Sequence, residues 1–173
     1  FLIPRADSYQ NEYIEPSNSR LEWRTGFTGS AGLCLVTLQS AFIFVDGRYK
    51  IQVKNETNKS LFKIVLTSDT SFAAWFQKNC MNQLIGYDPW LHTVSEIDKL
   101  AGDNTTAKIK KCLNLIDKIW TQRPCQMSQY LEAHSTKFSG VTSKIKRGLI
   151  SKIITDNGAD AVVLTKPESI CWL

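Results

Sequence analysis

A glycine-rich loop is the part of this chain whose residue types and spacing come nearest to a ligand-binding motif. Residues 24–32 read Arg-Thr-Gly-Phe-Thr-Gly-Ser-Ala-Gly and lead directly into an apolar run. Loops that cradle phosphates follow G-x-G-x-x-G or G-x-x-x-x-G-K-S/T and precede a helix, whereas this loop fits neither pattern and precedes a predicted strand. The context of Ser30 also differs from the G-x-S-x-G turn of a nucleophilic serine. Because glycine permits tight turns and close backbone approach, we expect a structural role for Gly26, Gly29 and Gly32.

Two pairs of opposite charges lie near this loop, each at the end of a predicted strand. They are Arg5 with Asp7, and Asp46 with Arg48. One interpretation is structural, with each pair hydrogen-bonding the turns around it. The other is that an arginine at a strand end presents a fixed fork of donors to a carboxylate of a ligand or of a partner subunit. Under the second interpretation, the candidate cleft-lining residues are Arg5, Asp7, Thr25, Phe27 and Arg48.

Metal-binding residue types are not gathered in a recognisable pattern. The two histidines, His92 and His134, are far apart in the sequence, and neither has acidic residues at metal-ligand spacing. The sequence therefore predicts no metal ligand, no catalytic residue and no bound cofactor in this chain. His92 is expected to complete a turn after Trp90, and we expect Trp90 to pack in the core rather than at an interface.

The composition favours a folded protein with one sizeable core. The chain has 173 residues, of which 43% are hydrophobic, and a formal net charge of +5. No dense basic stripe indicates nucleic acid, and the cluster of Lys108, Lys110 and Lys111 is expected to mark a solvated edge. No apolar run approaches the roughly 20 residues that a membrane span needs. We therefore expect neither a nucleic-acid nor a membrane partner.

The cysteines indicate a reducing compartment. Five cysteines are widely spaced and form no C-x-x-C pair, which is typical of buried thiols rather than of a disulfide framework. Three N-glycosylation sequons, at Asn55, Asn58 and Asn104, are close to the number that chance supplies in such a chain, so they do not indicate secretion. We predict a cytoplasmic protein.

Alternating strands and helices predict an α/β fold with a mixed sheet of about five to six strands, one hairpin and flanking helices. The predicted strands are Phe1–Pro4, Leu33–Leu38, Ala41–Val45, Leu61–Leu66, Gln83–Tyr87 and Ala107–Lys111. The predicted helices are Asn18–Arg24, Arg48–Asn55, Thr70–Asn79 and Thr93–Ala101. The last helix carries a capping box formed by Thr93 and Glu96, and Gln39 with Ser40 forms the hairpin turn.

The pattern changes after this layered region. Residues 121–140 are mixed and polar, which indicates a linker. A helix is predicted over Val141–Asn157, where apolar residues recur every four positions, and a buried strand is predicted over Ala159–Thr165.

The end of the chain repeats its beginning. Val162-Val163-Leu164-Thr165 aligns with Phe1-Leu2-Ile3-Pro4, and Ser169-Ile170-Cys171-Trp172 aligns with Arg20-Leu21-Glu22-Trp23. We infer two related domains. The first is expected to lack its initial helix and the second is only begun; they cover residues 1–120 and 141–173.

Five segments, in order, resemble the amino-terminal domain of the aminopeptidase P (Xaa-Pro aminopeptidase) family. They are Pro4-Arg5-Ala6-Asp7, residues 24–32, Asp46-Gly47-Arg48-Tyr49, residues 85–92, and residues 114–124. The tail from Gly158 to Leu173 resembles the start of the second domain in the long, three-domain form of this family. The likeness therefore runs along nearly the whole chain.

The resemblance implies that the parent protein is a metallopeptidase, usually manganese-dependent, which releases the first residue of peptides whose second residue is proline. Two creatinase-like domains then precede a "pita-bread" domain, absent from this chain, that holds two Mn²⁺ on two Asp, one His and two Glu. For this chain, the resemblance implies a non-catalytic N-terminal fragment that shapes the peptide cleft and makes subunit contacts in a homo-oligomer such as a dimer.

A different class of function is also compatible with the resemblance. Catalytically inactive relatives occur in histone chaperones, where the peptidase-like domain is a protein-interaction module. The sequence beyond Leu173 separates these alternatives, because an intact set of metal ligands there would favour the peptidase.

Overall fold

The computed structural model describes residues 1–102, 106–128, 130 and 132–173. Asn104, one of the three sequons, lies outside the described residues. The chain divides into two compact units, Phe1–Gln126 and Met127–Leu173, and each is described by itself.

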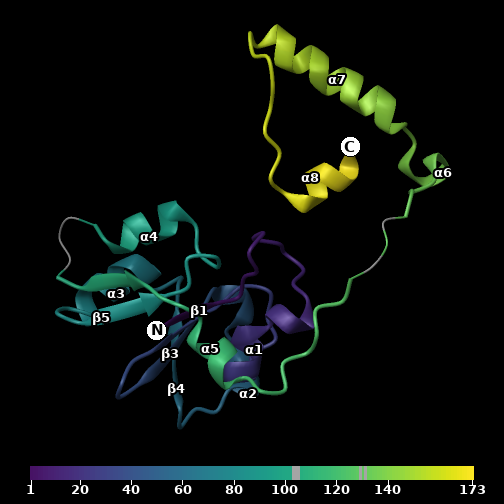
Figure 1. Cartoon of the computed structure of the whole chain (residues 1–173). Coiled ribbons are helices and arrows are strands. Elements are labelled where there is room, and N and C mark those ends of the chain that lie inside the picture. The colour runs from purple at the N-terminus through teal and green to yellow at the C-terminus, as the bar shows by residue number, and fades with distance from the viewer. Residues whose placement is uncertain (103–105, 129, 131) are drawn as a thin grey trace. The chain divides into compact units, whose positions relative to one another are not determined.

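A four-stranded mixed sheet forms the centre of the first unit (Figure 1). Its strands, in spatial order, are β1 (Leu2–Pro4), β2 (Leu33–Val36), β3 (Ala41–Val45) and β4 (Phe62–Leu66). β2 pairs antiparallel with β1 and with β3, whereas β4 pairs parallel with β3. β2 and β3 form the predicted hairpin, in which the Thr37 amide donates to the Ser40 carbonyl oxygen at 2.8 Å.

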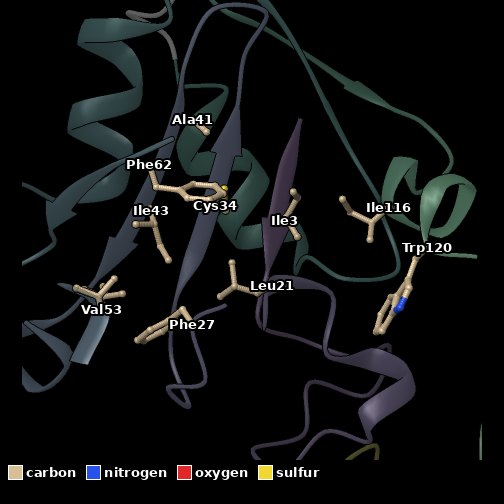
Figure 2. Packing of buried hydrophobic residues seen from close by; sticks show 11 residues of the cluster. Ile3, Leu21, Phe27, Cys34, Ala41, Ile43, Val53, Phe62, Ile116 and Trp120 are labelled. Atoms are coloured by element: carbon tan, nitrogen blue, oxygen red, sulfur yellow. The ribbon is translucent and has the colours of Figure 1, made fainter. Parts of the chain in front are cut away.

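Side chains that alternate along these strands enter two different hydrophobic clusters, as Ile43 and Phe44 do on β3. Helices α1 (Arg20–Thr25), α2 (Gln52–Glu56) and α5 (Leu115–Ile119) contribute to the first cluster through Leu21, Val53 and Ile116 (Figure 2). Helices α3 (Phe72–Asn79) and α4 (Val94–Leu100) contribute to the second through Phe76 and Leu100. The sheet is therefore covered on both faces, which is the predicted α/β class.

A second sheet pairs β5 (Leu84–Tyr87) and β6 (Lys108–Lys111) in parallel. All six strands predicted for residues 1–120 are present, but they form two sheets rather than one. β5 joins the larger sheet through side chains such as Ile85 in the second cluster, not through a hydrogen-bonded ladder among the described residues. The three lysines of β6 are exposed, as predicted.

Short polar motifs begin the helices. The Ser71 hydroxyl accepts from the Ala74 amide at 3.2 Å at the start of α3. The predicted capping box of α4 is confirmed, since Thr93 and Glu96 bond reciprocally at 3.2 and 2.8 Å. Two 3-10 turns, η1 (Pro16–Asn18) and η2 (Gly47–Tyr49), precede α1 and α2.

The prediction that Trp90 packs in the core is wrong, because its side chain is 75% exposed. Asp88 sets the turn: its carboxylate accepts from the Trp90 amide at 3.0 Å and from the Asn114 side-chain amide at 2.9 Å. This turn buries the next residue, Leu91, in place of Trp90.

The expectation of buried thiols holds for only part of the cysteines. Cys34 and Cys80 are buried, Cys112 is half-buried, and Cys125 and Cys171 are exposed; all five are free. Burial raises the pKa of the Cys34 thiol to about 12, so it is protonated and unreactive at neutral pH.

The second unit contains helices α6 (Thr136–Ser139), α7 (Ser143–Asp156) and α8 (Pro167–Trp172). The predicted helix over Val141–Asn157 is confirmed as α7. The buried strand predicted over Ala159–Thr165 is not formed, and Val163 is 86% exposed. A strand needs a partner for its backbone hydrogen bonds, and the described residues of this unit supply only helices. Across the described parts of both units, no helix is both long and apolar enough to cross a membrane.

Candidate functional site

A cleft of about 410 Å³ lies in the first unit where the glycine-rich loop meets the end of β1. Its walls come from the strand end, the loop and the segments that contain α3 and α4, and they include Pro4, Arg5, Ser30, Gly32, Phe72 and His92. The loop and strand end are joined directly, because the Arg5 amide donates to the Gly32 carbonyl oxygen at 2.9 Å. The stretch that the sequence singled out therefore borders the cleft.

Arg5 and Asp7 occupy different environments beside this cleft. Arg5 lines the cleft, and its Nη1 donates to the Glu12 carbonyl oxygen at 2.7 Å. Asp7 is only 4% exposed, and its carboxylate accepts from the amides of Tyr9 and Asn11, both at 3.0 Å. Asp7 organises the loop that follows β1, while Arg5 keeps guanidinium donors available to a ligand.

Gly26 ends α1 in a conformation that favours glycine. Its φ of +79° is left-handed, and its amide donates to the Glu22 carbonyl oxygen at 2.7 Å. A Cβ built at this position would approach the Glu56 carbonyl oxygen to 2.8 Å. Strain and crowding both require glycine here.

Phe27 explains the other two glycines. Its ring is 1% exposed and lies edge-on to Tyr49, with ring centroids 5.5 Å apart. A Cβ at Gly29 would lie 2.2 Å from the ring carbon Cζ of Phe27, and a Cβ at Gly32 would lie 3.1 Å from Cε1. The loop thus wraps around a buried phenylalanine, whose place in the core Figure 2 shows.

Thr25 fixes the approach to this phenylalanine. Its hydroxyl donates to the Leu21 carbonyl oxygen at 2.7 Å and accepts from the Phe27 amide at 3.1 Å. Thr25 is buried and borders none of the larger clefts among the described residues. Its observed contacts, like those of Phe27, hold the loop.

Arg48 lies on the exposed surface next to the loop. Its guanidinium binds the Asp46 carboxylate through Nε at 3.0 Å and Nη2 at 2.8 Å. The hydrogen bond from Arg48 lowers the pKa of Asp46. Nearby, the Ser30 hydroxyl and the Tyr49 phenol oxygen are 2.6 Å apart, which connects the glycine-rich loop to the Asp-Gly-Arg-Tyr segment.

A third polar group ties the loop to α2. The Glu56 carboxylate accepts from the Thr28 amide at 2.9 Å and from the Thr28 hydroxyl at 2.8 Å. Gln52 Nε2 adds a hydrogen bond to Glu56 at 3.0 Å. Desolvation raises the pKa of Glu56, but these hydrogen bonds outweigh it and the net pKa is lowered.

His92 is the cleft residue that sequence reasoning treated only as part of a turn. Its ring lies edge-on to Tyr87 at 5.7 Å, and its buried Nε2 has no hydrogen-bond partner among the described residues. Burial lowers the pKa of His92, against the opposing charges of Glu96 and Asp88, so the imidazole is neutral at pH 7. In the sequence, only the position of His92 between Trp90 and the capping box could have indicated that it lies at the cleft.

Among the described residues that line it, the cleft brings together charged side chains and the Ser30 hydroxyl without a nucleophile–base pair. Arg5 and Lys99 supply positive charge, Glu96 supplies a carboxylate that already caps α4, and Ser30 is bonded to Tyr49 rather than to a base. Within the described ranges, no three side chains of the His, Cys, Asp and Glu types converge as metal ligands would. The local chemistry supports recognition.

Comparison with known proteins identifies the fold family. Residues 13–119 match the family model of the Creatinase/Prolidase N-terminal domain, which spans more than half of the chain. This chain belongs to that family. The glycine-rich loop and the Asp-Gly-Arg-Tyr segment lie inside the matched range, whereas the strand end that carries Arg5 precedes it.

Curated relatives extend the match beyond this domain. "Aminopeptidase P1" of Lotus japonicus is 26% identical over 176 residues, which cover 99% of this chain and 27% of the relative. "Probable Xaa-Pro aminopeptidase P" of Penicillium rubens is 30% identical over 180 residues, which cover 100% of this chain and 29% of the relative. The chain spans less than a third of the length of these relatives.

Solved structures agree on the fold. X-prolyl aminopeptidase from Caenorhabditis elegans, described as a cytosolic enzyme with a di-nuclear active site, aligns with a TM-score of 0.86 at 24% identity, covering 99% of this chain and 29% of that one. X-Pro aminopeptidase from Thermotoga maritima aligns with a TM-score of 0.52 at 20% identity over 71% of this chain and 32% of that one. The predicted creatinase-like fold is confirmed.

Proposed function

We propose that this chain is the non-catalytic N-terminal part of a metal-dependent Xaa-Pro aminopeptidase. The observation that carries the proposal is the alignment of the entire chain with Xaa-Pro aminopeptidases more than three times its length. The parent enzyme releases the first residue from peptides with proline in second position. It acts in the cytoplasm and binds two Mn²⁺ in a pita-bread domain outside this chain.

Residues 1–120 act as a creatinase-like N-terminal domain, residues 121–140 as a linker, and residues 141–173 as the beginning of a second such domain. In the parent, the first domain supplies a wall of the peptide cleft and subunit contacts in a homo-oligomer. A rigid wall around a metal site admits short peptides and excludes folded proteins.

The candidate cleft residues divide by role in this proposal. Arg5 and Arg48 face the peptide, because both present guanidinium groups at strand ends beside the glycine-rich loop. Asp7, Thr25 and Phe27 position them, because their own contacts are with the loop backbone and the core.

Hydrolysis of an Xaa-Pro peptide, measured with this chain and with a chimera, tests the proposal. The 173-residue chain should show no turnover with added Mn²⁺. A chimera in which this chain replaces the aligned N-terminal part of the Penicillium rubens relative should hydrolyse the peptide. Turnover by the chain alone, or an inactive but folded chimera, would contradict the proposal, and the second result would favour an interaction module.

Substitution in the active chimera tests the role of Arg48. Arg48→Ala should raise KM with little change in melting temperature, because the side chain is exposed and its contacts are the Asp46 carboxylate and the Tyr49 ring. Lys54→Ala, a change of another exposed cation on α2, is the matched control and should leave KM unchanged. Equal changes in KM for the two substitutions would show that Arg48 does not contact the peptide.

A further inference from the structure

A second groove of the first unit, of about 470 Å³, shares Arg5 with the cleft but is otherwise lined by different residues, and it combines an aromatic face with two opposite charges. Its lining includes Ile14, Pro16, Trp23, Trp120 and Pro124. The two indole rings are stacked, with centroids 5.3 Å apart and an interplanar angle of 21°. Trp23 is 41% exposed, so its face is available to a ligand while Trp120 supports it from the core.

The walls of this groove are fixed by an ion-pair network. The Asp117 carboxylate binds Arg20 through Nε at 2.6 Å and Nη2 at 3.0 Å, and it binds Arg123 Nη1 at 3.0 Å. Arg123 Nε also donates to the Ser17 carbonyl oxygen at 2.6 Å. These bonds join η1, α1 and α5, so the groove is held in shape before any ligand arrives.

Arg5 and Glu22 provide the charges. Both border the groove and also a small adjoining cavity of about 30 Å³, which places them at the same end. They do not form an ion pair with each other in the described structure, and the Glu22 carboxylate accepts no hydrogen bond from the described residues. Arg5 uses Nη1 for the Glu12 carbonyl oxygen and has further donors available.

We propose that this groove binds a free α-amino acid with an aromatic or large aliphatic side chain. Glu22 receives the ammonium group, Arg5 receives the carboxylate, and the side chain packs on Trp23 between Pro16 and Pro124. Opposite charges that do not pair with each other complement a zwitterion, and the stacked indoles offer a rigid apolar surface. The groove volume lies within the range of small-ligand sites.

The biological meaning of the site, though not the binding itself, rests on the proposed function. An aminopeptidase releases free amino acids, so a groove on its N-terminal domain that binds them would sense the product. Binding to the 173-residue chain is measured without any catalytic readout, which keeps a failure of this inference distinct from a failure of the proposed function.

Titration of the 173-residue chain with four related compounds, followed by NMR of its five indole N–H signals, tests the recognition. L-phenylalanine should shift the Trp23 and Trp120 signals saturably, with a Kd on the order of 1 mM. Phenethylamine lacks the carboxylate, hydrocinnamate lacks the ammonium and L-alanine lacks the large side chain. Each of these three compounds should bind at least about tenfold more weakly than L-phenylalanine.

Two substitutions assign the charges. Glu22→Gln should weaken the binding of L-phenylalanine by about tenfold and leave the binding of hydrocinnamate unchanged. Arg5→Gln should weaken the binding of L-phenylalanine and leave the binding of phenethylamine unchanged. Asp98→Asn removes an exposed carboxylate of α4 and should change neither ligand. If Arg5→Gln does not fold, Glu22→Gln decides alone, because Glu22 is exposed.

Three results would overturn the inference. No saturable shift of the Trp23 and Trp120 signals would show that the groove takes no amino acid. Equal shifts by all four compounds would show non-specific apolar contact. A shift of the Trp23 signal on dilution without ligand would assign the groove to a second copy of the chain.

Discussion

Leu21 in α1 and Leu149 in α7 are apolar residues of helices in the two units, yet Leu21 is 1% exposed and Leu149 is 56% exposed. Leu21 faces a sheet that also receives Val53 from α2 and Ile116 from α5. Leu149 belongs to a stripe with Ile145 and Ile153, both more than half exposed, in a unit whose described residues form no sheet. An amphipathic pattern fixes where a helix is apolar, but burial requires a second surface.

The one buried residue of α7 shows what the second unit has in place of a core. Lys146 is 9% exposed, and its Nζ donates to the Trp172 carbonyl oxygen at 2.7 Å while lying 4.7 Å from the Trp172 ring centroid. A cation held between α7 and α8 gives a local contact, whereas the first unit has two extended hydrophobic clusters. Stability should therefore reside mainly in the first unit.

Truncation of the two leucines should show the largest difference between the units. Leu21→Ala should lower the free energy of unfolding of the first unit by about 3 kcal/mol, because a fully packed side chain leaves a cavity. Leu149→Ala should change the free energy of unfolding of the second unit by less than about 0.5 kcal/mol, because the Leu149 side chain is already half in water. Chemical denaturation followed by near-UV circular dichroism measures both, and similar losses would mean that Leu149 is buried in solution.

Glycine substitutions should have effects of opposite sign in the two units. Gly29→Val should destabilise the first unit by roughly 1–3 kcal/mol, because the new side chain would displace the Phe27 ring. Gly148→Ala is the matched change in α7, where nothing lies within 4 Å, and it should stabilise the helix by about 1 kcal/mol. Helix content by far-UV circular dichroism and thermal melting report the two effects.

The glycine comparison fails if Gly29→Val leaves the melting temperature unchanged. That result would show that the loop is not packed around Phe27. Gly26→Val and Gly32→Val extend the test, with Gly26 expected to respond through strained backbone and Gly32 through its 3.1 Å approach to Phe27 and Leu21.

Asp117→Asn should destabilise the first unit by about 1–2 kcal/mol at neutral pH, which is less than the truncation of Leu21. Partial burial opposes ionisation, but hydrogen bonds and charge from Arg20 and Arg123 lower the pKa of Asp117 overall. A lowered folded-state pKa contributes stability that is present above the ordinary value of about 4 and is lost as pH falls through the folded-state pKa. The difference between wild type and variant should shrink on acidification below about pH 4.

Urea unfolding at a series of pH values measures this dependence. Asp98→Asn is the control, because Asp98 is exposed on α4 and makes no ion pair within the described ranges. A stability difference for Asp117→Asn that does not change with pH would show that the carboxylate acts by shape and hydrogen bonding rather than by charge.

Local patterns predicted the elements because their physical causes are local. The continuous apolar run of β3, the Thr93–Glu96 capping box and the four-residue steps of α7 each lie within a short segment. The failures involve pairing and orientation. The division of six strands into two sheets and the exposure of Trp90 depend on partners distant in sequence, such as Asn114 bound to Asp88.

The candidate site was predicted in part. Arg5 and the glycine-rich loop were selected from charge at a strand end and glycine spacing, and both border the cleft. His92, Glu96 and Lys99 join them from segments about 60 residues or more downstream, and no local pattern marks that approach. Thr25 and Phe27 were selected by proximity to the loop, but their side chains turn into the protein.

The sequence by itself determined the α/β class, the strand positions and most helix positions of the first unit, and the family resemblance, because these depend on periodicity, capping and ordered motifs. Only the tertiary structure decided why the three glycines are needed, since that reason is the Phe27 ring and the Glu56 carbonyl oxygen. Likewise, only folding brings Trp23 to Trp120, and Asp117 to Arg20, across almost a hundred residues. Contacts between distant segments form only when the chain packs, so the local spacing of residue types does not predict them.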